Sequence, residues 1–128
     1  MSDAVTGGHY VPGNANEVGL QLAALGRQLE AAQAALKAAD LEAVRSKLEA
    51  EREFDKAYVG ASTGSVEDRK ANARLETYEL RLTAEVKASE VRARVWEIKT
   101  IQARIDVGRT IGAGIRKETE LGSYGGAA

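Results

Sequence analysis

The stretch from Val66 to Leu121 contains no proline, and it contains no glycine before Gly108. Proline breaks a helix interior and glycine weakens it, so this stretch predicts one long helix. Ser65 precedes it as a candidate N-cap, and Glu67 and Asp68 suit the positive end of the helix dipole. A long helix needs a partner over its apolar side, and the preceding half of the chain is the first candidate.

The segment 16–59 has the apolar spacing of a second helix. Its first half alternates steps of four and three, which is the heptad pattern of a coiled coil. This seam consists of Val18, Leu22, Leu25, Leu29, Ala32, Leu36 and Ala39. Around Asp40 the apolar set shifts to Leu41, Val44 and Leu48, followed by Phe54 or Asp55 and by Tyr58. This shift indicates either a stutter or a short break capped by Asp40. We expect a continuous helix, because the flanking residues are strong helix formers.

The segment 60–65 contains the glycines and small polar residues of a turn. So short a connection predicts antiparallel neighbours. The expected fold is therefore all-α, a long antiparallel helical hairpin of coiled-coil type with helices at 16–59 and 66–121. Residues 1–15 and 122–128 are expected to be flexible tails. The apolar stripe of the second helix is expected to contain Leu75, Tyr78, Leu82, Val86, Val91, Val95, Ile98, Ile101, Ile105, Ile111 and Ile115.

Composition excludes several classes of function. The chain has no cysteine, and its one histidine, His9, lies in the glycine-rich N-terminal tail, so no nucleophile–base pair or metal site is apparent. We expect no enzyme activity and no cofactor. No apolar run approaches the roughly 20 residues that span a bilayer. Residues 1–8 lack the basic and apolar segments of a signal peptide, so we expect a cytoplasmic protein that contacts no membrane.

Three glycines near the end of the second helix require a cause, because each costs about 1 kcal/mol relative to alanine. Gly108 and Gly112 lie one turn apart on one face. Either the helix ends or kinks near Gly112, or another helix approaches closely there, which we would place between subunits. A narrow hairpin seam also favours association of copies. The candidate oligomer seam is Leu22, Leu25, Leu29, Leu36, Ile105, Gly108, Gly112 and Ile115.

Charge is unevenly distributed although the net charge is only −1. Residues 92–117 carry seven basic and two acidic side chains, a net charge of +5, whereas residues 40–55 carry three basic and six acidic ones. With the turn centred at residues 62–63, the basic segment faces residues 8–33, which hold few charges. Its partner is then another copy, which we favour, or the phosphates of nucleic acid. The candidate face is Arg92, Arg94, Lys99, Arg104, Arg109, Arg116 and Lys117, with Trp96 expected in the core.

The runs from Arg104 to Glu118 and from Gly64 to Lys70 resemble small helical proteins of tailed bacteriophages and prophages, which are largely uncharacterised. The resemblance covers roughly residues 40–120, and the most specific run is Arg104 to Arg109. Such proteins are often encoded near recombination and single-strand-binding genes. The resemblance implies a phage protein of the host cytoplasm in a DNA-metabolism context, and it implies no catalytic residues.

These observations predict a non-enzymatic accessory or adaptor protein of phage DNA replication or recombination. It would act through coiled-coil contacts with itself and with another protein, with weak DNA binding as a lesser activity. Two alternatives stay open: a structural assembly factor, such as a scaffold- or chaperone-like coiled coil, and a small inhibitor of a host protein.

Overall fold

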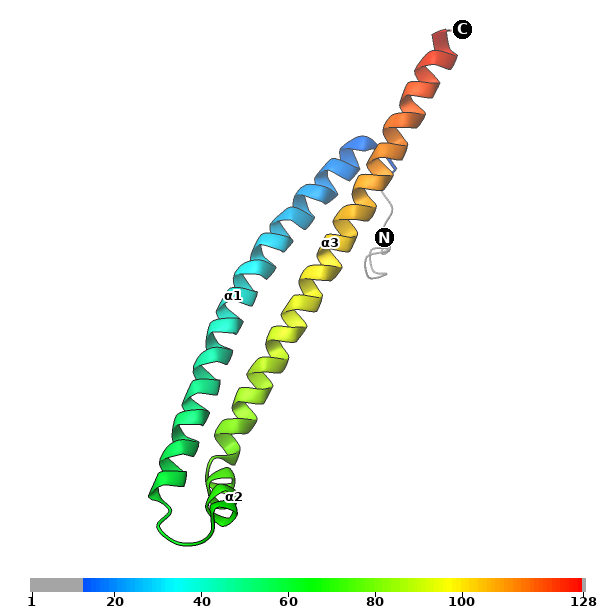
Figure 1. The fold of residues 1–128 in the computed structure, drawn as a ribbon. Helices are drawn as coiled ribbons and strands as arrows, with labels where there is room; N and C mark the ends of the chain where they lie inside the picture. The colour runs from blue at the N-terminus through cyan, green and yellow to red at the C-terminus, as the bar shows by residue number, and fades with distance from the viewer. Residues whose placement is uncertain (1–12, 128) are drawn as a thin grey trace, which may run out of the picture. The chain divides into compact units, whose positions relative to one another are not determined.

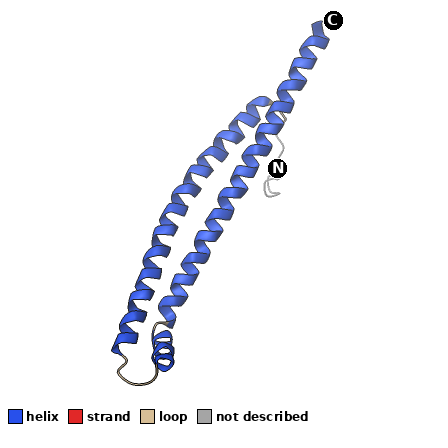
Figure 2. Ribbon diagram, viewed as in Figure 1, coloured by secondary structure: helices blue, strands red, loops and turns tan. Residues whose placement is uncertain are grey.

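A computed structural model describes residues 13–127 of the chain, with side chains described for residues 13–122. The described residues form three helices and no strand: α1 (Ala15–Gly60), α2 (Val66–Glu76) and α3 (Tyr78–Ala127) (Figures 1 and 2). The all-α class predicted from the sequence is confirmed. The chain divides into two compact units, each described by itself. The central unit is Ala32–Ile98, and the terminal unit contains the described residues up to Ala31 and from Lys99 onward.

Helix α1 begins one residue from the predicted start and runs unbroken through Asp40. Its N-terminus is capped by Asn14, whose Oδ1 accepts the backbone N–H of Glu17 at 2.9 Å. The Glu17 carboxylate accepts the backbone N–H of Gly13 at 2.9 Å in return. The first bond satisfies a donor that the first helical turn leaves free, and the second holds the residue before the cap. The expectation of a continuous helix is confirmed.

The predicted shift of the apolar seam at Asp40 is wrong. In the central unit the least exposed positions of α1 keep the heptad spacing through Ala43, Ser46, Ala50 and Ala57. Leu41, Val44 and Leu48 face outward and are 52%, 47% and 57% exposed. The sequence contains two apolar series on different sides of one helix, and the smaller side chains occupy the inner one.

The predicted single helix 66–121 is interrupted at Thr77, which separates α2 from α3. Ser65 caps α2 as expected, in a capping box completed by Asp68. Thr77 is buried, and its hydroxyl donates to the carbonyl of Ala73 at 2.7 Å. A threonine that bonds back to this carbonyl bends a helix, because its side chain competes with the backbone ladder. Figure 1 shows α2 and the start of α3 running in different directions.

Two arginines donate hydrogen bonds to backbone carbonyls at the C-termini of α1 and α2. The last turn of α1 contains no basic residue, and Arg69 of α2 supplies one by donating from Nη2 to the Tyr58 carbonyl at 3.3 Å. The Arg69 guanidinium also lies 4.5 Å from the centre of the Tyr58 ring. Arg81 of α3 donates from Nη2 to the Arg74 carbonyl in the last turn of α2 at 2.9 Å. A cation at a helix C-terminus satisfies free carbonyls and offsets the negative end of the dipole.

The ends of the chain differ from the predicted tails. Helix α3 continues to Ala127, beyond the predicted end of the helix at residue 121. No proline follows Pro12, and Gly122, Gly125 and Gly126 each cost only about 1 kcal/mol relative to alanine. In the predicted N-terminal tail, Ala15 is already helical, while residues 1–12, including His9, lie outside the described residues.

In the terminal unit, the glycines of α3 pack against leucine and valine of α1. A Cβ placed on Gly108 would lie 2.8 Å from Leu22 Cδ2, and one on Gly112 would lie 3.2 Å from Val18 Cγ1. Because α3 is continuous here, the alternative of a helix end or kink at Gly112 is wrong. The predicted close approach occurs, but its partner is helix α1 of the same chain. The predicted register is also wrong. A turn centred at residues 62–63 places Gly108 opposite Glu17, whereas Gly108 lies against Leu22.

We expect a Gly108→Val variant to be destabilised by about 1–3 kcal/mol, because the added side chain overpacks the contact with Leu22. The matched control is Gly114→Val on the same helix, where nothing lies within 4 Å of the added Cβ. That control gains a few tenths of a kcal/mol from helix propensity. Urea unfolding followed by circular dichroism measures both, and equal stability of the two variants would contradict the close contact.

Candidate functional site

The predicted oligomer seam lies on the inner side of the helices. Leu25, Gly108 and Gly112 are buried, and the other five members of the set are half-buried. Leu22, Gly108 and Gly112 are among the residues that join α1 to α3 within the terminal unit. The described chain therefore already uses part of this seam internally, and a surface for another molecule has to be sought elsewhere.

The central unit has a seam made of small side chains. Its buried hydrophobic residues are Ala32, Ala50 and Ala73, whereas the terminal unit buries Val18, Leu25 and Ile101. An alanine contributes little apolar area, so this unit gains less free energy from burial than its apolar content allows. Polar residues also occupy inner positions, including the buried Thr77 and the half-buried Lys87. The Nζ of Lys87 lies 3.1 Å from Glu42 Oε1.

Several large apolar side chains of the central unit are exposed instead. On α1 they form a line that we call the outer stripe, Leu41, Val44 and Leu48. On α3, Tyr78, Leu82 and Val86 are 55%, 45% and 57% exposed, although the sequence analysis placed them in the hairpin seam. Trp96, expected in the core, is 67% exposed. Runs of apolar residues at helical spacing on a surface are typical of sites that bind another helix.

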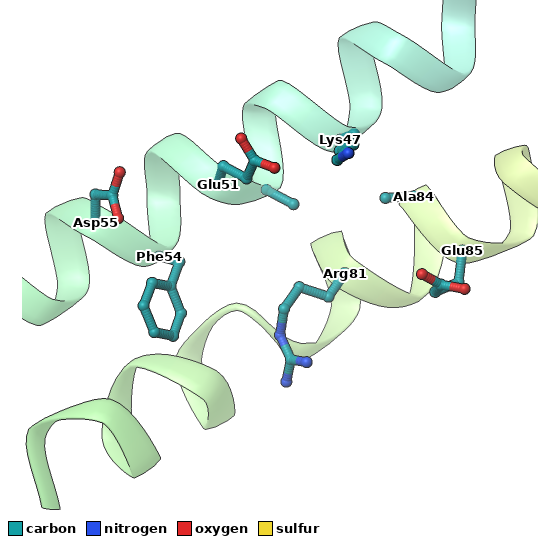
Figure 3. A pocket seen from close by; sticks show the side chains of 8 residues that line it. Lys47, Glu51, Phe54, Asp55, Arg81, Ala84 and Glu85 are labelled. Atoms are coloured by element: carbon teal, nitrogen blue, oxygen red, sulfur yellow. The ribbon is translucent and has the colours of Figure 1, made fainter. Parts of the chain in front are cut away.

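A hollow of about 400 Å³ opens between α1 and the junction of α2 with α3, inside the central unit. Figure 3 shows Phe54 and Arg81 extending into the space between the helices, with Glu51 and Asp55 at its rim on α1 and Glu85 on α3. Ala50 and Ala84 line it as well. Sequence analysis missed this hollow, because its lining residues come from two helices that lie far apart in the sequence.

The hollow is lined by charged, aromatic and small apolar side chains. The Arg81 guanidinium already donates to the Arg74 carbonyl, and its buried Nε has no hydrogen-bond partner within the described part of the chain. Among the described residues no cluster of histidine, cysteine or carboxylate side chains could hold a metal ion. Phe54 extends toward the space between the helices, whereas the Glu51 and Asp55 side chains lie on the opposite side of α1 from its ring (Figure 3).

The predicted basic set does not form one face. Arg92 and Arg94 belong to the central unit and the other five residues to the terminal unit. Arg94 lies on the inner line of α3 and pairs with Glu97 at 3.4 Å. Arg104 and Arg109 flank that line on opposite sides, and Arg109 lies 4.0 Å from Asp106. The remaining exposed members are Arg92, Lys99, Arg116 and Lys117.

Comparison with known proteins gives no family to which the chain can be assigned. No protein-family model matches it, and neither a curated protein nor a solved structure matches it significantly. Within the described residues, no helix combines the length and the apolar character that crossing a membrane requires.

We expect an Arg81→Met variant to lose about 1 kcal/mol of stability, because the C-terminus of α2 loses a charged donor. Hydrogen exchange of the amides around residues 74–80 should accelerate in that variant. Arg81→Lys should retain most of the protection, since it keeps the charge and a donor, and Arg92→Met on the exposed side of α3 serves as the control. Exchange at the junction that is unchanged in Arg81→Met would refute this role of Arg81.

Proposed function

We propose that this chain is a non-enzymatic adaptor protein whose central unit associates with other helices, first of all with a second copy of itself. In this proposal α1 and α3 pair as an antiparallel helical hairpin of coiled-coil type. The sequence resemblance to small phage proteins supports a role as an accessory of phage DNA replication or recombination in the host cytoplasm.

One observation carries the proposal: the buried apolar residues of the central unit are alanines, whereas Leu41, Val44 and Leu48 of the outer stripe are exposed. Full burial of a leucine or valine contributes about 1.5–3 kcal/mol, so burial of a half-exposed one contributes about 1 kcal/mol. Three such residues from each of two copies supply roughly 6 kcal/mol, which is similar to the lower estimates of the cost of association. The outer stripe therefore supports a weak, concentration-dependent association with help from its charged neighbours.

The exposed apolar residues of α3, Tyr78, Leu82 and Val86, favour a structural assembly factor as the alternative function. A chain with apolar lines on two helices can bind two neighbours at once, and contacts between unlike surfaces continue into open assemblies. The distinction between the two functions is therefore the size of the assembly at high concentration.

Multi-angle light scattering over a hundredfold range of concentration tests the proposal. An adaptor should pass from monomer to one defined oligomer, most simply a dimer of about twice 13.6 kDa. Mass that continues to grow with concentration would favour the assembly factor, and a monomer at every concentration would refute self-association.

Weak DNA binding is tested separately by fluorescence anisotropy with labelled single- and double-stranded DNA. We expect any affinity to fall with rising salt, because bound phosphates release counterions. Replacing Arg92, Arg104 and Arg109 with glutamate should abolish it while the helical content stays constant. Since these residues do not share one face, we expect few phosphate contacts and a shallow salt slope. Binding that the triple variant leaves unchanged would exclude the basic set as its cause.

A further inference from the structure

We infer that the second copy docks antiparallel along the back of α1, about a twofold axis at the level of Ser46. In this arrangement Val44 lies opposite the partner's Leu48, and Lys37 lies opposite the partner's Asp55. The inference rests on the proposed self-association and specifies its surface, direction and register.

The first argument is the spacing of the outer residues of α1. The outer stripe extends in both directions at alternating steps of four and three, and every member is exposed. The extended series is Lys37, Leu41, Val44, Leu48, Glu51 and Asp55. This is a second heptad seam on the side of α1 that faces away from α3. A heptad seam is filled by another helix with the same spacing, and a second copy of α1 provides one.

Charge determines the direction of the second copy. A parallel, in-register pair would place Lys37, Glu51 and Asp55 each opposite its own copy, which gives repulsion at three levels. An antiparallel pair about Ser46 places Lys37 opposite the partner's Asp55 at both ends of the contact. Neither of these two side chains has an ion-pair partner among residues 13–122. The twofold axis therefore gives each of them one.

The same axis places the apolar residues together at the centre. Val44 and Leu48 of the two copies form two adjacent apolar layers, and Leu41 lies at the level of the partner's Glu51. Shifting one copy by a heptad in one direction brings Glu30 opposite the partner's Asp55. The opposite shift sets Val44 and Leu48 against the carboxylates of Asp55 and Glu51. Both shifts replace attraction with repulsion or bury a carboxylate against apolar carbon, so the register at Ser46 is favoured.

The surface of α1 has a depression beside Glu51, where the proposed register places the partner's Leu41. A shallow hollow of about 660 Å³ is lined on this helix by Leu48, Glu51, Arg52, Asp55 and Val59, among others. The partner's Leu41 falls at the level of Glu51 and therefore meets this hollow, as a knob meets a hole in a coiled coil. Arg45 and Lys47 approach their own copies near the axis, and each has a glutamate one turn later on its own helix, Glu49 and Glu51. These pairs at four-residue spacing reduce the repulsion.

The test compares dimer dissociation constants by sedimentation equilibrium, with circular dichroism to verify that each variant is helical. Leu48→Glu should weaken the dimer by at least about tenfold, which corresponds to roughly 1.4 kcal/mol. The matched control Leu82→Glu, an equally large change on the outer side of α3, should leave it unchanged. Lys37→Glu and Asp55→Lys should each weaken the dimer, and the double variant should restore it. Equal dissociation constants for the Leu48→Glu and unsubstituted chains would overturn the inference, as would a double variant that is no stronger than the single ones.

Disulfide trapping tests the direction independently, because the chain has no cysteine of its own. An equimolar mixture of Val44→Cys and Leu48→Cys chains should oxidise mainly to the mixed dimer. Predominant dimers of identical variants would indicate a parallel pair and overturn the inference. An oligomer that resists Leu48→Glu leaves the proposed function standing on another surface, whereas an unsubstituted chain that stays monomeric removes both proposals.

Discussion

The small size of the inner side chains in the central unit is the constraint on which the other features of this unit depend. Ala43, Ala50 and Ala84 let helix backbones approach, but they leave little apolar area to bury. Most of the large aliphatic side chains that a stable helix pair normally encloses are consequently displaced to the back of each helix. A unit built in this way gains free energy from any helix that covers those residues, which supports the proposed association.

The terminal unit differs from the central unit, because its helix contact pairs small residues with large ones. There Gly108 and Gly112 provide the small surface on one helix, while Leu22 and Val18 provide the large one on the other. A large residue facing a glycine buries substantial area at a short distance between helices, which two facing alanines do not. The two units thus have the same heptad spacing but different energetics, and we place the partner-binding function in the central unit for that reason.

Much of the secondary structure was predictable from the sequence, because helix formation depends on local signals. The continuity of α1 followed from helix-forming residues around Asp40, and the start of α2 followed from the capping sequence at Ser65. The interruption at Thr77 was not predictable in this way, since it arises from a buried hydroxyl that bonds to the carbonyl of Ala73. The capping arginines are equally hidden, because Arg69 and Arg81 act on helices other than their own.

The choice between two apolar series on α1 shows where reasoning from spacing ends. Leu41, Val44 and Leu48 are more apolar than Ala43, Ser46 and Ala50, so hydrophobicity favours the first set as the seam. Packing favours the second set, because continuing the heptad register of Val18 and Leu25 avoids a stutter in the helix pair. The rejected series then keeps its own coiled-coil spacing on the opposite side of the helix. We propose that a second copy of the chain covers this second seam.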